Sequence, residues 1–127
     1  MDRPQIRLNS TVLGAPDASE LAAFYERLLG WERGTNKPGW VTLQPPLLGT
    51  GLSFQSEPDC VPPVWPSQPS EQQIMLDLDL AVDDLDAAVA WAVEVGARLA
   101  DFQPQEDVRV MLDPVGHPFC LFPGTFE

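Results

Sequence analysis

The stretch that decides the fold is residues 17–31, which read DASELAAFYERLLGW. Asp17 can cap a helix, and Glu20 three residues later completes a capping-box pattern. From Leu21 onward, apolar residues recur at the i, i+3, i+4, i+7, i+8 spacing of a helix with one buried side. Gly30 provides the stop, because a residue without Cβ adopts left-handed backbone at little cost. The sequence therefore predicts an amphipathic helix that begins after Asp17 and ends at Gly30.

Strand candidates surround this helix. Residues 6–13 alternate in polarity before it, and short apolar segments separated by Gly and Pro follow it at 31–33, 40–43 and 52–55. The first half of the chain is therefore predicted to run strand, helix, strand, strand, strand.

The second half repeats this order. Residues 74–82 alternate, Asp83 and Asp84 open a helix whose acids complement its N-terminal dipole, and Gly96 ends that helix. The strand candidates that follow are residues 97–101, 108–112 and 119–122, with a turn at 113–116. The chain is thus predicted to be a duplication, with module one at about 6–56 and module two at about 74–123.

A proline-rich connector, residues 57–73, separates the two modules. Its prolines exclude a central strand or a helix, so we expect a semi-rigid segment. Trp65 lies in its middle and must pack somewhere, either as cover for a core or as a lid over a pocket. We expect residues 1–127 to form a single domain, since domains of this length are common.

The charge balance excludes some classes of partner. Nineteen acids against seven bases give a net charge of -12, which opposes binding to nucleic acid or to anionic membranes. The acidic surface either serves solubility alone or attracts a cationic ligand. Two cysteines make no disulfide framework, and the N-terminal residues lack the blocks of a signal peptide. We therefore expect a cytoplasmic protein with no membrane span.

Three segments carry a resemblance to a known family. Residues 17–31, residues 77–88 and residues 113–121 together resemble the vicinal oxygen chelate superfamily of glyoxalases, bleomycin-resistance proteins and extradiol dioxygenases, and within it the glyoxalase-like domain. The match extends from about residue 6 to about residue 123. The resemblance implies an α+β fold of two tandem βαβββ modules that form a curved sheet around a cavity, with the helices on the outer face. It also implies a homodimer.

The family's metal-dependent members bind a divalent ion through His or Gln on the first strands of the modules and Glu on the last strands. By resemblance, these positions fall on Ser10, Asp77, Cys120 and either Ser53 or Gln55. A catalytic metal needs three protein ligands, and imidazole and carboxylate donors are largely missing here. We therefore expect no metal and no other cofactor.

Two carboxylates mark one wall of the expected cavity. Alternation places Leu76, Leu78 and Leu80 on the helix side, and Met75, Asp77, Asp79 and Ala81 on the cavity side. Three interpretations stay open for Asp77 and Asp79. One carboxyl could act as an acid or base, both could bind a cation, or one or both could pair with Arg109 on a neighbouring strand.

Two other reactive side chains have simpler interpretations. His117 is the only histidine and stands in the turn before the last strand, where a structural role is expected. Cys120 lies between Phe119 and Leu121, which favours a buried, unreactive thiol over a nucleophile.

Three functions are compatible with this sequence. The first is a binding protein that encloses an aromatic or cationic small molecule. Its candidate ligand-binding residues are Ser10, Trp40, Phe54, Gln55, Trp65, Met75, Asp77, Asp79, Arg109, Met111, Cys120 and Phe122. The second is a lyase, isomerase or dioxygenase of the superfamily, either metal-assisted or with Asp77 as the catalytic acid or base, so whether the protein is an enzyme stays open. The third is a domain acting through protein contacts alone, which the acid pair on a cavity wall disfavours.

Overall fold

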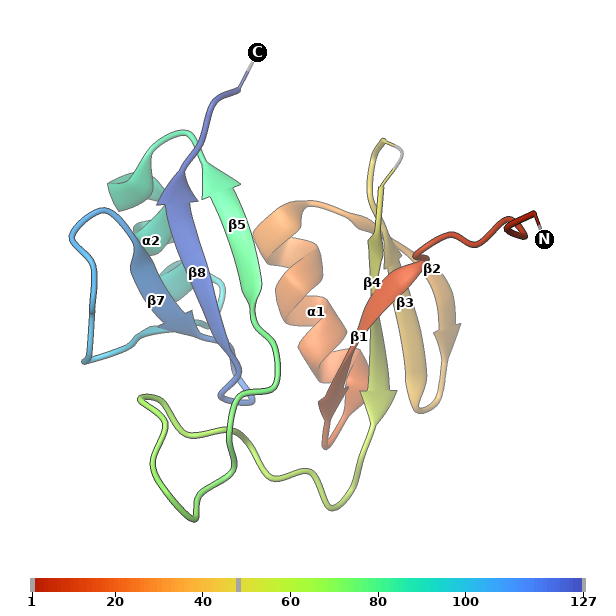
Figure 1. Ribbon diagram of the computed structural model, residues 1–127, viewed down its shortest axis with the longest axis horizontal. Helices are drawn as coiled ribbons and strands as arrows, with labels where there is room; N and C mark the ends of the chain where they lie inside the picture. The colour runs from red at the N-terminus through yellow and green to blue at the C-terminus, as the bar shows by residue number, and fades with distance from the viewer. Residues whose placement is uncertain (1, 48, 127) are drawn as a thin grey trace. The chain divides into compact units, whose positions relative to one another are not determined.

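A computed structural model describes residues 2–47 and 49–126 of the chain. Between Pro58 and Asp59 the chain divides into two compact units. Among these residues, each unit forms one helix and one sheet, and Figure 1 shows both units. None of the helices formed by these residues is long and apolar enough to span a membrane.

Unit one has the predicted strand–helix–strand–strand–strand order. Its elements are β1 (Ser10–Ala15), α1 (Ala18–Leu29), β2 (Glu32–Lys37), β3 (Trp40–Gln44) and β4 (Gly51–Ser56). The strands form sheet A in the order β1-β4-β3-β2, with β1 parallel to β4 and the other neighbours antiparallel.

The caps predicted for the first helix are confirmed. The side chain of Asp17 accepts hydrogen bonds from the backbone N–H groups of Ser19 and Glu20, at 2.9 and 3.3 Å. Gly30 ends α1 with a φ of 72°, in the left-handed region that favours glycine.

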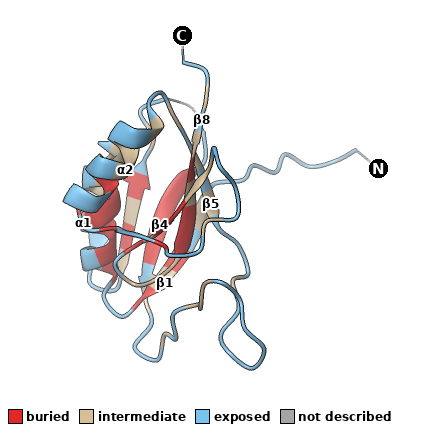
Figure 2. Ribbon diagram, turned by 90° about the vertical axis from the view of Figure 1, so that its left-hand side faces the viewer, coloured by how far each residue is buried: buried red, intermediate tan, exposed pale blue. Residues whose placement is uncertain are grey.

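The core of unit one lies between α1 and sheet A. Phe24 and Tyr25 are fully buried on one side of α1, while the other side is exposed (Figure 2). Tyr25 stacks on Phe54 of β4 with ring centroids 5.6 Å apart. Along β3 burial alternates, so Val41 and Leu43 are buried against the helix and Thr42 points to the opposite face. We call this opposite face of each sheet its far face.

Unit two repeats the arrangement. Its elements are β5 (Leu78–Val82), α2 (Leu85–Glu94), β6 (Arg98–Leu99), β7 (Arg109–Leu112) and β8 (Pro118–Pro123). They form sheet B in the order β5-β8-β7-β6, again with only the first pair parallel. The predicted α+β fold of two βαβββ modules is therefore confirmed.

The first strand of each module is shorter at its start than the alternation predicted. β5 begins at Leu78 instead of Ile74, and β1 at Ser10 instead of Ile6. Leu78 pairs with Phe119, so Asp77 would face Pro118, which has no N–H to donate. The polarity of the sequence can alternate beyond the end of a strand. The strand itself ends where the neighbouring strand offers no further hydrogen-bonding partner.

The connector is attached to unit two. The indole N–H of Trp65 donates to the carbonyl oxygen of Phe102 at 3.1 Å, and the two rings lie 6.0 Å apart. The N–H of Val64 donates to the carbonyl oxygen of Gln72 at 3.0 Å, which closes the connector into a loop. Trp65 is half-buried and packs as the sequence required.

Candidate functional site

Two carboxylates and a thiol meet on the far face of sheet B. Asp79 on β5 lies opposite Cys120 on β8 in the parallel pair, and Asp77 immediately precedes β5. The thiol of Cys120 donates to Oδ2 of Asp77 at 3.8 Å. Ligand atoms of all three side chains lie within 4.8 Å of one another, and both carboxylates are exposed. The parallel pairing of β5 and β8 thus concentrates negative charge around a protonated sulfur.

The environment of Cys120 keeps its thiol protonated. Burial raises its pKa to about 11, and the negative charges of Asp77 and Asp79 add to the effect. Only the thiolate is a strong nucleophile, so this cysteine is a hydrogen-bond donor at neutral pH. The sequence led us to expect a buried, unreactive thiol at Cys120, and in the structure this residue is half-buried.

Alkylation should report this pKa directly. In a Cys60→Ser background, the rate of reaction of Cys120 with iodoacetamide should rise about tenfold per pH unit from pH ~7.5 to pH ~10, without a plateau, because the thiolate fraction is still rising. Asp77→Asn should accelerate the reaction at about pH 8, since it removes a negative charge beside the sulfur. Mass spectrometry measures both rates. A plateau below about pH 9 would contradict the arrangement described here.

A pocket of about 330 Å³ adjoins the carboxylate–thiol cluster. Its lining combines acidic and amide side chains with apolar ones: Asp79, Gln105, Asp107, Val108, Cys120, Phe122 and Pro123. Pockets of a few hundred Å³ that pair an apolar surface with a few polar groups are typical of small-ligand sites. The apolar surface here can contact a ring or alkyl group, and the carboxylates can contact a positive charge.

Besides Pro123, which ends β8, three of these lining residues were not predicted from the sequence: Gln105, Asp107 and Val108. They belong to the segment between β6 and β7, and the structure brings that segment beside Phe122. Gln105 and Asp107 lay outside every predicted strand, where periodicity assigns no face, and Val108 stood at the first position of the strand predicted at 108–112.

The corresponding positions in unit one carry hydroxyl groups. The hydroxyl oxygens of Ser10 and Ser53 lie 2.8 Å apart and share a hydrogen bond. The amide of Gln55 instead donates to a carboxylate oxygen of Glu57, and Trp40 lies opposite Gln55 on the neighbouring strand. Of the two fourth-strand alternatives, Ser53 is therefore the residue beside Ser10.

Several candidate ligand-binding residues lie elsewhere. Phe54 belongs to the helix side of sheet A, and Met111, opposite Phe119, is fully buried on the helix side of sheet B. Met75 precedes β5 and is 86% exposed. Arg109 donates to the carbonyl oxygens of Glu106 and Val108 at 2.7 and 2.9 Å, so its guanidinium is held by its own loop and makes no ion pair with the acids.

The residues do not fit the metal-binding set that the family resemblance implies. Ser10 and Ser53 hydrogen-bond to each other, and the sulfur of Cys120 holds its proton with a pKa of about 11. Among the described residues, the group whose spacing could hold an ion is Asp77, Asp79 and Cys120. That group lacks imidazole and offers its sulfur only after deprotonation.

Comparison with protein families gives a clear match. The model of the glyoxalase-like domain family matches residues 10–122. The chain therefore belongs to this family, and the resemblance to the vicinal oxygen chelate superfamily is confirmed. A comparison with curated proteins finds no significant match.

Solved structures share the fold at low sequence identity. A glyoxalase/bleomycin resistance protein/dioxygenase family enzyme from Burkholderia phytofirmans is 18% identical, with a TM-score of 0.68, over 91% of this chain and 97% of the other. The oxidase ChaP-H2 is 18% identical, with a TM-score of 0.65, over 97% of each chain. A bleomycin resistance determinant encoded on the transposon Tn5 is 22% identical, with a TM-score of 0.61, over 99% and 100%. At these identities the likeness establishes the fold.

Proposed function

We propose that this protein binds a small organic cation on the far face of sheet B. The observation that carries the proposal is the pair of exposed carboxylates, Asp77 and Asp79, beside a pocket of about 330 Å³. Within residues 2–47 and 49–126, neither carboxylate forms an ion pair. Arg109, which one of the three interpretations paired with these acids, is engaged by backbone carbonyls. A cationic ligand would therefore meet uncompensated negative charge.

The ligand would also carry an apolar or aromatic portion. Phe122 and Val108 line the pocket together with Asp79, so a flat ring can lie against them while its charged end reaches the carboxylates. The net charge of -12 adds a long-range attraction for cations. The structural neighbour named for bleomycin resistance makes metal-free bleomycin the first larger ligand to test. The homodimer implied by the family stays a prediction.

The acid pair is tested by a matched pair of ligands. Calorimetry should detect binding of 4-aminobenzamidine, a flat cation, and should detect weaker binding of the neutral 4-aminobenzamide. Asp79→Asn should weaken amidine binding about tenfold, since a charge-assisted contact in a pocket is worth about 1.4 kcal/mol. Asp77→Asn should act in the same direction.

Asp59→Asn is the control, because it removes the same charge from an exposed residue outside this pocket. It should leave amidine affinity unchanged within about twofold, as expected for a screened surface charge. Equal affinity for the amidine and the amide, or equal losses in the Asp79→Asn and Asp59→Asn variants, would contradict the proposal.

Catalysis is the second candidate function. One observation favours it: the carboxylate oxygens of Asp77 and Asp79 and the sulfur of Cys120 lie within 4.8 Å of one another, as metal ligands do. An enzyme without metal would have to rely on Asp77 as its acid or base.

Metal content separates the two functions. We expect purified protein to contain no stoichiometric transition metal, because the cluster has no imidazole and both of its carboxylates are exposed to water. Added Zn, Ni, Mn or Fe should give no thermal stabilisation, whereas a site at a hundred times its Kd would contribute about 2.7 kcal/mol. Elemental analysis that finds close to one metal per chain, lost in an Asp77→Asn/Asp79→Asn variant, would make catalysis the leading function.

A further inference from the structure

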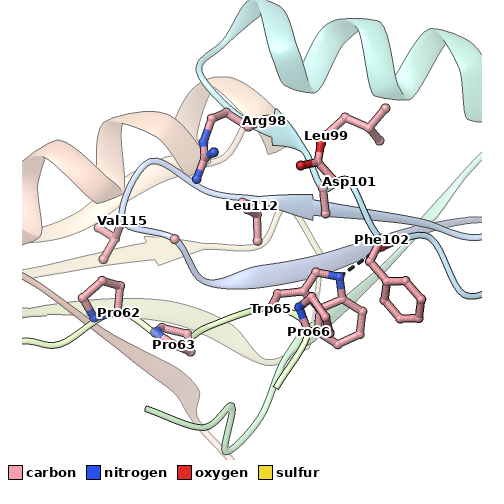
Figure 3. A pocket seen from close by; sticks show the side chains of 12 residues that line it. Pro62, Pro63, Trp65, Pro66, Arg98, Leu99, Asp101, Phe102, Leu112 and Val115 are labelled. Carbon is pink, nitrogen blue, oxygen red and sulfur yellow. Dashed lines mark hydrogen bonds between the residues drawn. The ribbon is translucent and has the colours of Figure 1, made fainter. Parts of the chain in front are cut away.

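A second pocket, of about 440 Å³, lies where the connector meets β6 and the loop that follows it. Figure 3 shows Pro62, Pro63 and Trp65 of the connector on one side, and Arg98 and Asp101 on the other. None of the residues that line it lines the pocket beside Asp79. All of its lining residues belong to unit two, so the pocket is complete within that unit.

Its aromatic part is fixed in place. The Trp65 indole N–H already donates to the carbonyl oxygen of Phe102, so the polar end of the ring is satisfied and its apolar faces remain for contact. The Phe102 ring is tilted by 41° from the indole plane and is 50% exposed. Pro62 and Pro63 extend this surface with rigid apolar rings. A ligand ring therefore meets a pre-organised aromatic surface, which lowers the entropic cost of binding.

Its charged part offers one group of each sign. Arg98 and Asp101 both line the pocket, yet no ion pair or hydrogen bond of either side chain is found in the described part of the chain. Unit two contains two strongly basic side chains, and the other, Arg109, is held by backbone carbonyls. Arg98 is thus available for a carboxylate, and Asp101 for an ammonium group.

We propose that this pocket binds the zwitterion of an aromatic amino acid. The carboxylate contacts Arg98, the ammonium group contacts Asp101, and the ring packs on Trp65 and Phe102. The zwitterion has no net charge, so the protein's net charge of -12 does not repel it as it would an aromatic anion. The site is distinct from the proposed cation site, and either can fail without the other.

The experiment is a titration of the intact chain followed by the NMR signal of the Trp65 indole N–H, assigned with a Trp65→Phe variant. The probes are L-phenylalanine, 3-phenylpropanoate, which lacks the ammonium group, and phenethylamine, which lacks the carboxylate. L-phenylalanine should shift the signal with a Kd of about 1 mM, as expected for a small ligand in an open pocket. Each analogue should bind roughly five- to tenfold more weakly, because one charge-assisted contact is lost.

Two substitutions assign the charges. Arg98→Gln should weaken L-phenylalanine and 3-phenylpropanoate by about fivefold and leave phenethylamine unchanged. Asp101→Asn should weaken L-phenylalanine and phenethylamine and strengthen 3-phenylpropanoate. Arg7→Gln, which removes an exposed cation of unit one, is the matched control and should change nothing.

Three results would overturn the proposal. The first is a Trp65 signal that stays unmoved up to about 20 mM L-phenylalanine, since a contact that weak is not a site. The second is equal loss of affinity in the Arg98→Gln and Arg7→Gln variants. The third is equal affinity for all three probes, which would mean that only the ring is recognised.

Discussion

Replacing Asp113 with alanine should lower the free energy of unfolding by about 3 kcal/mol, because it removes the acceptor for a whole turn. Asp113 is 1% exposed, and its Oδ1 accepts the backbone N–H groups of Val115, Gly116 and His117 at 2.9 to 3.0 Å. Its Oδ2 lies 2.8 Å from Nδ1 of His117. Without this carboxylate, the half-buried N–H groups of Val115 and His117 lose their acceptor, and Gly116 keeps only the backbone carbonyl oxygen of residue 113.

Urea denaturation followed by circular dichroism measures this loss of free energy. In thermal denaturation, the Tm should fall by roughly 10 °C for a chain of this size. Asp113→Asn retains one acceptor oxygen and should cost less, about 1–2 kcal/mol. Asp59→Ala, on an exposed loop, is the control and should stay within about 0.5 kcal/mol of the wild type. An unchanged denaturation midpoint for Asp113→Ala would show that the turn does not depend on this side chain.

Phe54→Ala should be still more destabilising, by about 4 kcal/mol, because it opens a cavity beneath α1. The Phe54 ring is fully buried and stacks on Tyr25 at 5.6 Å. Alanine leaves the Tyr25 ring without that contact and removes a large apolar area from the core. Phe126→Ala is the matched control, since Phe126 is 62% exposed, and it should change the free energy of unfolding little.

This variant also separates packing from ligand binding. Phe54 was a candidate lining residue, and a residue of that kind would alter ligand affinity more than stability. From its place on the helix side of sheet A, we expect the reverse. Affinity for 4-aminobenzamidine should be unchanged in the folded fraction of the variant. A large change in affinity with little change in stability would contradict that placement.

The module order could be predicted because its signals are local. Asp17 and Gly30 define the ends of the first helix through capping chemistry alone, and the structure has both caps in place. The turn at Asp113 follows equally from turn chemistry. Such signals involve residues a few positions apart, so they can be recognised without knowledge of the tertiary structure.

Side-chain placement on the strands was harder to predict. Phe54 alternates with Ser53 and Gln55, so it could not share a sheet face with Gln55, yet both were candidates for one lining. Met111 lies between two other apolar residues on a short strand, where no change in polarity marks its face. The partners of Arg109 depend on the path of the loop before β7. Strand register and loop paths are set by distant contacts, which a single sequence does not display.

The equivalence of the two modules extends to their far faces. The same interval of sequence separates Asp17 from Asp84, Ser10 from Asp77 and Ser53 from Cys120. One module places two hydroxyl groups at these far-face positions, and the other places a carboxylate and a thiol.

Because the two faces of each sheet differ in this way, residues on the far face can be replaced without loss of the fold. The largest buried side chains of sheet B, those of Met111, Phe119 and Leu121, lie on its helix side, so exchanges on the far face leave them in place. A combinatorial library at Asp77, Asp79, Cys120 and Phe122 should therefore yield mostly folded clones. Selection from such a library could redirect ligand preference while every clone keeps the same helix, caps and turn. After a gene duplication, the far-face residues of one module could change in the same way while those of the other module stayed the same.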